Sequence, residues 1–348
     1  MKNADKQVRL FMASQPPPGS LHAILKTFLL TKHRKGLSVH TVNRYYYSIH
    51  PIAEAHEGGS VSDITAAWLK GYIDGCWLRY APESVRSIIT DVRHFFRWCK
   101  KKGHHKKNIA KRIKPAKKRP RRHRRTKAAP EAGIIAVMRH LAGQLIERGL
   151  IYRDIFRRLA LGDGEWDYPD ILCLRDLFIL TFLYETGARG GELAALGSQA
   201  MCAAVDKPAS VYMVTVIGKT DDSDYYFTSA TADLWHIWQQ VRPQEQLDRA
   251  VVGWQSRTRC RAISTDGISH MLVRRCEAAG VRPFRAHSLR HAKTKRSVVL
   301  VGIETTRQLL DHANLETTRD YNILGETELG KAALATGLQE DFFQPDHS

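Results

Sequence analysis

Apolar residues recur at helical spacing through the first third of the chain. Between residues 19 and 103 they mark one face of four successive segments, which is the pattern of amphipathic helices. The segments begin near Leu21 and after Ser38, Ser62 and Ser84. Serine is a favoured N-cap, because its side-chain oxygen accepts a hydrogen bond from a free N–H of the first helical turn. The pattern therefore predicts a four-helix bundle, with the polar, proline-containing residues 1–18 preceding its first helix.

The rest of the chain, about 130–345, is also mostly helical in pattern. A helix is predicted after Pro130, and Leu172–Tyr184 is a strongly apolar one. Val211–Val216 and Tyr225–Thr228 flank a polar tip at 218–224, which predicts a β-hairpin. Further helices are predicted at about 231–241, 265–279, 287–301, 305–312 and 315–322. The fold class is therefore mainly α with a small antiparallel β-sheet (α+β).

Composition narrows the class of protein. A length of 348 residues suggests two domains, and 43% hydrophobic with 26% charged residues is typical of a chain with a real core. Apolar runs are far shorter than a membrane helix needs, and no secretory signal is visible. The six cysteines contain no Cys-x-x-Cys pair, which predicts reduced thiols in a cytoplasmic protein without a disulfide framework or structural zinc.

The positive charge is concentrated in one segment. The formal net charge is +19, and sixteen of the 54 Lys and Arg residues lie between Lys100 and Pro130, where there is no Asp or Glu. Such a run could be a solvated linker or a nuclear-localisation-like sequence, but its place between two patterned regions favours a linker that lies along DNA phosphates. We therefore predict a helical domain at 19–103, a basic linker at 104–129 and a second domain at 130–348. The candidate DNA contacts are Lys117, Lys118, Arg119, Arg121, Arg122, Arg124 and Arg125.

Four short segments of the second region are unusual together. They are Thr186–Leu193, Ile217–Lys219, His287–His291 and Leu309–Tyr321. Each has an ordinary interpretation alone: Arg189 and Glu192 fit a surface ion pair at i,i+3, and Lys219 fits any hairpin tip. His287 and His291, at i,i+4, could suggest zinc, but no glutamate stands between them and no third ligand is evident, so no metal is predicted.

Taken in order, these segments resemble the catalytic boxes of the tyrosine recombinase (phage integrase) family. The boxes are Thr-Gly-x-Arg-x-x-Glu-Leu, the hairpin Gly-Lys, His-x-Leu-Arg-His, Leu-x-His and a terminal Tyr. The first region resembles the family's N-terminal core-binding domain, including the helix start at Leu37, Ser38 and Thr41. The resemblance covers roughly 19–325. It implies a two-domain, C-shaped clamp with an N-terminal helical bundle and a C-terminal catalytic domain.

The resemblance implies transesterification at a DNA phosphodiester, without metal, ATP or another cofactor. Tyr321 would be the nucleophile and would form a 3′-phosphotyrosyl link. A phenol has a pKa near 10, so it must lose its proton as it attacks. Arg189 and Arg290 would stabilise the charge that develops on the phosphate, because a guanidinium donates paired hydrogen bonds to phosphate oxygens and stays charged.

The resemblance also implies how protons are handled. Lys219 would protonate the departing 5′-oxygen, and His287 would act as acid and base toward the tyrosine. His312 would donate a hydrogen bond to the phosphate, and Glu192 would hold a guanidinium or its helix in place.

The implied partner is double-stranded DNA. Family members act as four protomers around two DNA segments, so we expect a homotetramer on paired sites and a monomer or weak dimer in free solution, in a bacterial or phage-type cytoplasm. The tail Thr327–Ser348, with Phe342 and Phe343, is a candidate for docking on a neighbouring protomer. Two alternatives stay open: a type IB topoisomerase-like DNA relaxase and a non-catalytic, sequence-specific DNA-binding protein.

Overall fold

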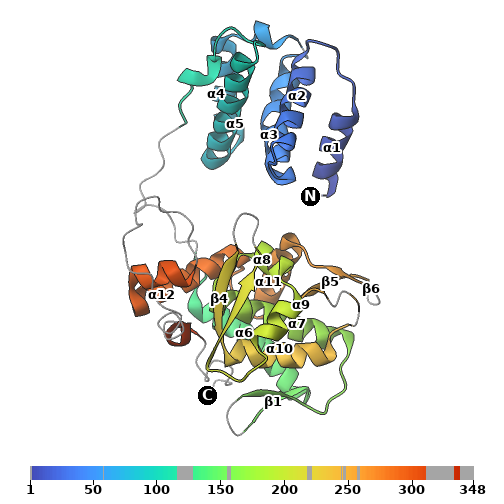
Figure 1. Cartoon of the computed structure of the whole chain (residues 1–348), viewed down its shortest axis with the longest axis vertical. Helices are drawn as coiled ribbons and strands as arrows, with labels where there is room; N and C mark the ends of the chain where they lie inside the picture. The colour runs from blue at the N-terminus through green and yellow to red at the C-terminus, as the bar shows by residue number, and fades with distance from the viewer. Residues whose placement is uncertain are drawn as a thin grey trace. The chain divides into compact units, whose positions relative to one another are not determined.

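The computed structural model describes residues 2–57, 59–115, 128–154, 158–217, 222–243, 245, 248–256, 259–310 and 333–337. The chain divides into two compact units, Met1–Arg124 and Arg125–Ser348 (Figure 1). Both units are mostly helical, as the sequence predicts. The helices and strands that follow are labelled as in Figure 1.

The first unit contains the four predicted helices. They are α2 (Leu21–Arg34), α3 (Val39–Ala55), α4 (Ala66–Arg79) and α5 (Pro82–Lys101), with the short 3₁₀ turns η1 (Val61–Asp63) and η2 (Ile109–Arg112). Ser38 caps α3 as predicted, and its hydroxyl accepts a hydrogen bond from the Thr41 N–H at 3.3 Å. Two predicted helix starts are wrong. Thr65 rather than Ser62 caps α4, and α5 begins at Pro82, because proline is well tolerated in a first turn that has no N–H partners.

A further helix, α1 (Lys2–Ala13), precedes these four, and the sequence analysis missed it. Its Val8 and Phe11 are buried in the core of the first unit. The Phe11 ring lies 5.1 Å from the Tyr46 ring and 5.2 Å from the His50 ring, centroid to centroid. The apolar residues of α1 are buried because α3 and His22 of α2 lie against them.

A buried carboxylate joins α3 to α5. Asp91 is fully buried and accepts hydrogen bonds from Arg44 Nε at 3.1 Å, from Arg44 Nη2 at 2.9 Å and from the Ser48 hydroxyl at 2.8 Å. A buried charge is tolerated when it is paired and hydrogen-bonded in this way. The contact therefore fixes the relative orientation of the two longest helices of the bundle.

The start of the predicted linker belongs to the first unit. Ala110 in η2 is buried in the same core, and the His105 ring nitrogen Nε2 lies 3.2 Å from the Ile64 carbonyl oxygen. Residues 116–127 lie outside the described part of the chain, as do the seven candidate DNA contacts within them.

The second unit is built around α7 (Tyr168–Thr186). Every residue from Cys173 to Thr186 on this helix is buried, because other elements pack around it. The surrounding helices are α6 (Glu131–Glu147), α8 (Gly190–Ala195), α9 (Ser198–Ala204), α10 (Ser229–Val241), α11 (Thr265–Ala278) and α12 (Ala286–Leu309). A helix that is apolar on all sides is expected at the centre of a domain.

Small antiparallel sheets lie around this helical core. The predicted hairpin is formed by β3 (Val211–Val216) and β4 (Ser223–Thr228), with Val216 opposite Ser223 and Val214 opposite Tyr225. Two further hairpins were not predicted: β1 (Ile151–Arg153) with β2 (Leu159–Leu161), and β5 (Val252–Ser256) with β6 (Arg259–Ala262). Each described sheet therefore has two strands.

Helix α12 carries the segment His287–His291, one of the predicted catalytic boxes. It contains the predicted helix 287–301, and it bends at Gly302, which has φ 78° and ψ 169° and separates that helix from the next predicted one. The predicted helix at 315–322 lies outside the described residues. Among the helices that are described, none combines the length and apolar character required to span a bilayer.

Candidate active site

Arg189 lies at the junction of α7 and α8. Gly187 ends α7 in the left-handed conformation, with φ 67°, and its N–H donates to the Leu183 carbonyl at 3.0 Å. Glycine suits this position because it adopts positive φ without strain. The chain then turns into α8 at Arg189, whose side chain is 52% exposed. The turn thus presents a guanidinium at the surface next to a buried helix end.

Glu192 holds this arginine from one turn further along α8. Its carboxylate accepts a hydrogen bond from the Arg189 backbone N–H at 2.7 Å and pairs with Arg189 Nη1 at 2.6 Å. The Tyr225 hydroxyl on β4 donates to the same carboxylate at 2.6 Å. Burial by itself would raise the pKa of Glu192, but the hydrogen bonds from Tyr225 and Arg189 outweigh it and lower the pKa. Glu192 is therefore an ionised anchor for both residues.

Arg290, in contrast to Arg189, is only 4% exposed. It lies in the second turn of α12, where Nη1 donates to the Gly187 carbonyl at 2.7 Å and Nη2 donates to the Leu310 carbonyl at 2.7 Å. The guanidinium therefore joins the end of α7 to the residue that follows α12. The C-terminal ends of both helices have free carbonyl groups, which a cation satisfies well.

Tyr225 connects the two arginines. Its pKa is raised to about 12, first by burial and then by its hydrogen bond to Glu192, while the nearby Arg290 guanidinium opposes the rise. Arg189, Glu192, Tyr225 and Arg290 thus form one continuous polar cluster drawn from α8, β4 and α12. A fully buried phenol with a raised pKa is a poor nucleophile, so Tyr225 fits a role as hydrogen-bond donor.

His287 lies on the first turn of α12, one turn before Arg290. It is exposed, and its ring centroid is 4.3 Å from that of His291 in an edge-on arrangement. Within the described residues, no three His, Cys, Asp or Glu side chains gather in a group that could hold a metal ion.

Three of the predicted catalytic residues lie outside the described part of the chain. They are Lys219, His312 and Tyr321. Lys219 falls in sequence between Val216, the last residue of β3, and Ser223, the first of β4. His312 comes two residues after Leu310, whose carbonyl Arg290 holds. The described residues therefore bring together Arg189, Glu192 and Arg290, with His287 on the same helix as Arg290.

Two polar residues near this cluster were missed by the sequence analysis. The sequence predicts Tyr225 only as a strand residue, and it does not single out Lys293. Lys293 is 1% exposed and lies one turn after Arg290. A signal was available for Lys293, since it occupies the same helical face as the apolar Leu289 and a charged residue on such a face requires a partner.

The chain is similar to known proteins in the sequence of its second unit and in its fold. Residues 167–327 match the phage integrase family. A lambda integrase (75–356) dimer bound to a COC′ core site is similar, with 15% identity over 88% of this chain and 99% of that chain and a TM-score of 0.58. The XerH site-specific recombinase bound to palindromic difH substrate gives 13% identity, 91% and 90% coverage and a TM-score of 0.60. A search of curated proteins gives no match.

The second unit is thus a phage integrase family domain, and the likeness to the solved structures extends over both units of the fold. The chain therefore carries a domain of the phage integrase family, the tyrosine-type site-specific recombinases of DNA.

Proposed function

We propose that this recombinase cuts and rejoins DNA strands through a 3′-phosphotyrosyl intermediate. The observation that carries the proposal is the cluster in which Glu192 and Tyr225 join Arg189 to Arg290. Two fixed guanidiniums suit a phosphate that gains negative charge in its transition state. A merely structural ion pair would not require a second arginine from a distant helix.

The proposed reaction exchanges one ester for another. The Tyr321 oxygen forms a bond to phosphorus as the bond from phosphorus to the 5′-oxygen breaks. The phenol proton passes to His287 acting as base, and Lys219 supplies a proton to the departing 5′-oxygen. His312 donates to the phosphate. A 5′-hydroxyl of DNA reverses these steps to rejoin the strand, so the ester energy is kept and no nucleotide is consumed.

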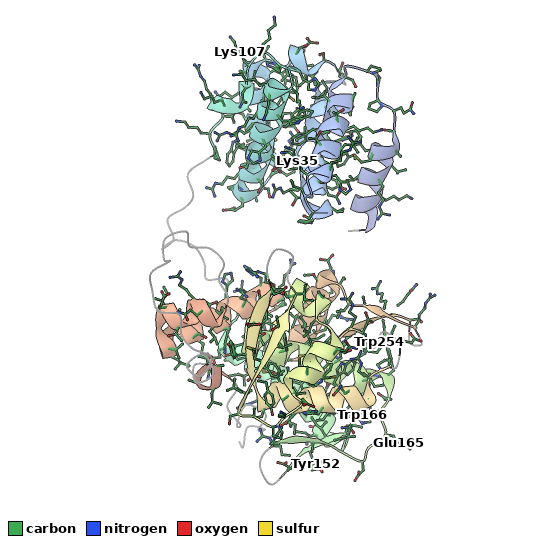
Figure 2. All side chains as sticks on the ribbon, in the orientation of Figure 1. Lys35, Lys107, Tyr152, Glu165, Trp166 and Trp254 are labelled. Atoms are coloured by element: carbon green, nitrogen blue, oxygen red, sulfur yellow. The ribbon has the colours of Figure 1, made fainter. Side chains whose placement is uncertain are left out.

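The test compares wild type with Tyr321→Phe on a supercoiled plasmid carrying the DNA that flanks the gene. We expect a covalent protein–DNA adduct and strand exchange for wild type, and DNA binding without adduct for the variant. Tyr152→Phe is the matched control, because Tyr152 is exposed on β1 (Figure 2) and its loss should leave the adduct yield unchanged. Binding without any adduct from wild type would favour the DNA-binding module. Adduct and relaxation without exchange would favour the relaxase.

The DNA-contact proposal concerns the basic linker and has its own test. Neutralising Arg121, Arg122, Arg124 and Arg125 should weaken binding to all DNA sequences. If each contacts a phosphate, the slope of log K against log salt should flatten by about 0.9 per arginine. An unchanged slope would mean that these residues do not contact phosphates.

We also propose assembly as a homotetramer on paired DNA sites. A lambda integrase tetramer bound to a Holliday junction is among the similar structures, with 16% identity over 92% of this chain and a TM-score of 0.59. Sedimentation with and without DNA that carries two sites should show four protomers only on the DNA.

A further inference from the structure

A buried lysine on α12 holds a distant segment of the same chain. Lys293 Nζ donates to the Thr336 carbonyl at 2.8 Å and to the Thr336 hydroxyl oxygen at 2.6 Å. Among the described residues, both hydrogen-bond acceptors of this nitrogen belong to Thr336. Thr336 is itself fully buried. The short segment Ala333–Gly337 is therefore anchored in the second unit by its buried residues, while Leu334 and Ala335 are exposed.

The residues that contact this segment form what we call its seat, and they fit it closely. They are Glu185, Tyr226, Thr228, Lys293 and Leu309. Ala333 packs against Tyr226 and Leu309 in a small apolar cluster. A Cβ added at Gly337 would overlap the Thr228 methyl carbon and would lie 3.1 Å from Glu185 Oε1. Only a residue without a side chain fits there, so the seat is matched to the sequence of the segment.

The seat also contains a buried carboxylate with its own hydrogen bonds. Glu185 on α7 is buried and accepts hydrogen bonds from the Thr228 N–H at 3.2 Å and from the Thr231 hydroxyl at 2.6 Å. Burial lowers the pKa of Lys293 to about 7, although the Glu185 charge opposes this and the Arg296 charge adds to it. Both protonation states of an amine can donate two hydrogen bonds. Departure of the segment would leave Lys293 buried with its two acceptors removed, which is costly.

The same helix holds both ends of the stretch that carries the proposed nucleophile. Residues 311–332 include His312 and Tyr321. Before this stretch, the Leu310 carbonyl is held by Arg290; after it, Thr336 is held by Lys293. Arg290 and Lys293 are one helical turn apart. The stem of Lys293 also packs on Gly187, the residue whose carbonyl Arg290 holds, since a Cβ there would lie 3.4 Å from Lys293 Cγ.

We propose that Lys293, together with the nearby Glu185, is a positioning residue for strand transfer. By anchoring Ala333–Gly337, it keeps the stretch that carries the tyrosine close to Arg290 of the same chain. The proposal rests on the proposed function for its catalytic part. Fixing both ends of the stretch beside the reacting phosphate raises the effective concentration of the nucleophile there.

The first test is Lys293→Met in the full-length protein. Methionine fills similar space without a polar group, so the fold is expected to persist. Hydrogen exchange of residues 333–337 should accelerate, DNA affinity should stay the same, and adduct formation should fall roughly tenfold or more. Lys295→Met is the matched control, because Lys295 is exposed on the same helix and its loss should change neither readout. Unchanged exchange at 333–337, or adduct formation within twofold of wild type, overturns the proposal.

A second variant changes the bound segment instead of the residues that hold it. Gly337→Ala leaves Lys293 intact but places a methyl group against Thr228 and Glu185. It should reproduce both effects of Lys293→Met. Thr336→Ser, which keeps the carbonyl and a hydroxyl, should retain wild-type exchange and adduct formation.

Mixing two variants decides whose segment fills the seat. Lys293→Met has the tyrosine but no anchor, and Tyr321→Phe has the anchor but no tyrosine. If each chain seats its own segment, the mixture stays as low as Lys293→Met alone. Recovery of adduct would show that a neighbour's seat receives the segment, and would overturn the same-chain arrangement. If wild type forms no adduct at all, the catalytic part falls with the proposed function, while hydrogen exchange still decides the anchor.

Discussion

Replacing Lys293 should also change how the stability of the second unit depends on pH. In the folded protein burial lowers the pKa of Lys293 from 10.5 to about 7, with Glu185 opposing and Arg296 reinforcing the shift. In the unfolded chain the amine returns to its ordinary pKa. Between these two values the unfolded chain binds a proton that the folded chain does not. The free energy of unfolding therefore rises with pH across this window, and below about pH 7, where both states are protonated, Lys293 adds no slope.

The size of the effect follows from the same two values. One proton bound only in the unfolded state gives a slope of about 1.4 kcal/mol per pH unit. From pH 7.5 to pH 9, wild type should gain about 2 kcal/mol relative to Lys293→Met. The other titratable groups are common to both proteins, so their contributions cancel in the difference.

The assay is urea unfolding of both full-length proteins at several pH values between 7.5 and 9. Hydrogen exchange of α7 peptides reports on the second unit alone, which avoids mixing in the transition of the first unit. Parallel curves, with a constant difference between the two proteins at every pH, would refute the reasoning. They would mean that Lys293 reaches solvent or a compensating charge and keeps its ordinary pKa.

Two further predictions concern hydrogen bonds to carboxylates, one partly buried and one fully buried. Tyr225→Phe removes the donor to Glu192 and should destabilise the second unit by about 1.5–3 kcal/mol and slow adduct formation, whereas Tyr152→Phe should change stability by less than about 0.5 kcal/mol; equal urea midpoints for the two variants would contradict this. Asp91→Ala removes the acceptor that Arg44 and Ser48 of α3 share, and should destabilise the first unit by about 2–3 kcal/mol while leaving exchange in α7 unchanged. Hydrogen exchange of α3 and α5 measures that loss, and protection equal to wild type would contradict it.

The hydrophobic pattern along the chain was sufficient to predict those elements whose own residues carry a clear helical or strand signal. Helices α2 to α5, the apolar α7 and the β3–β4 hairpin follow from apolar spacing and turn residues. The same pattern did not predict elements whose burial or pairing depends on residues elsewhere in the chain. The apolar residues of α1 are buried by contacts with residues such as Tyr46 and His50 of α3, which lie far from α1 in the sequence. The strands β1, β2, β5 and β6 are short, and pairing with each other rather than alternation along the chain defines them.

The candidate site divides in the same way. The resemblance predicted the catalytic set, and the described residues place Arg189, Glu192 and Arg290 in one cluster. The roles of these residues stay predictions, as does that of His287. The same holds for Lys219, His312 and Tyr321, which lie outside the described residues. Tyr225 could not be found in this way, because its function depends on which helix end its strand faces after folding.

Helix α12 organises the second unit through three cations spaced three residues apart. Arg290 holds the end of α7 and the residue after α12, Lys293 holds Thr336, and Arg296 pairs with Glu131 at the start of α6. Successive residues at this spacing lie on neighbouring turns, each offset by about 60° around the helix. A small displacement of α12 therefore moves all three contacts together. Because α6 begins just after the basic linker, the contacts form one physical connection between the linker end, the arginine cluster and the C-terminal segment.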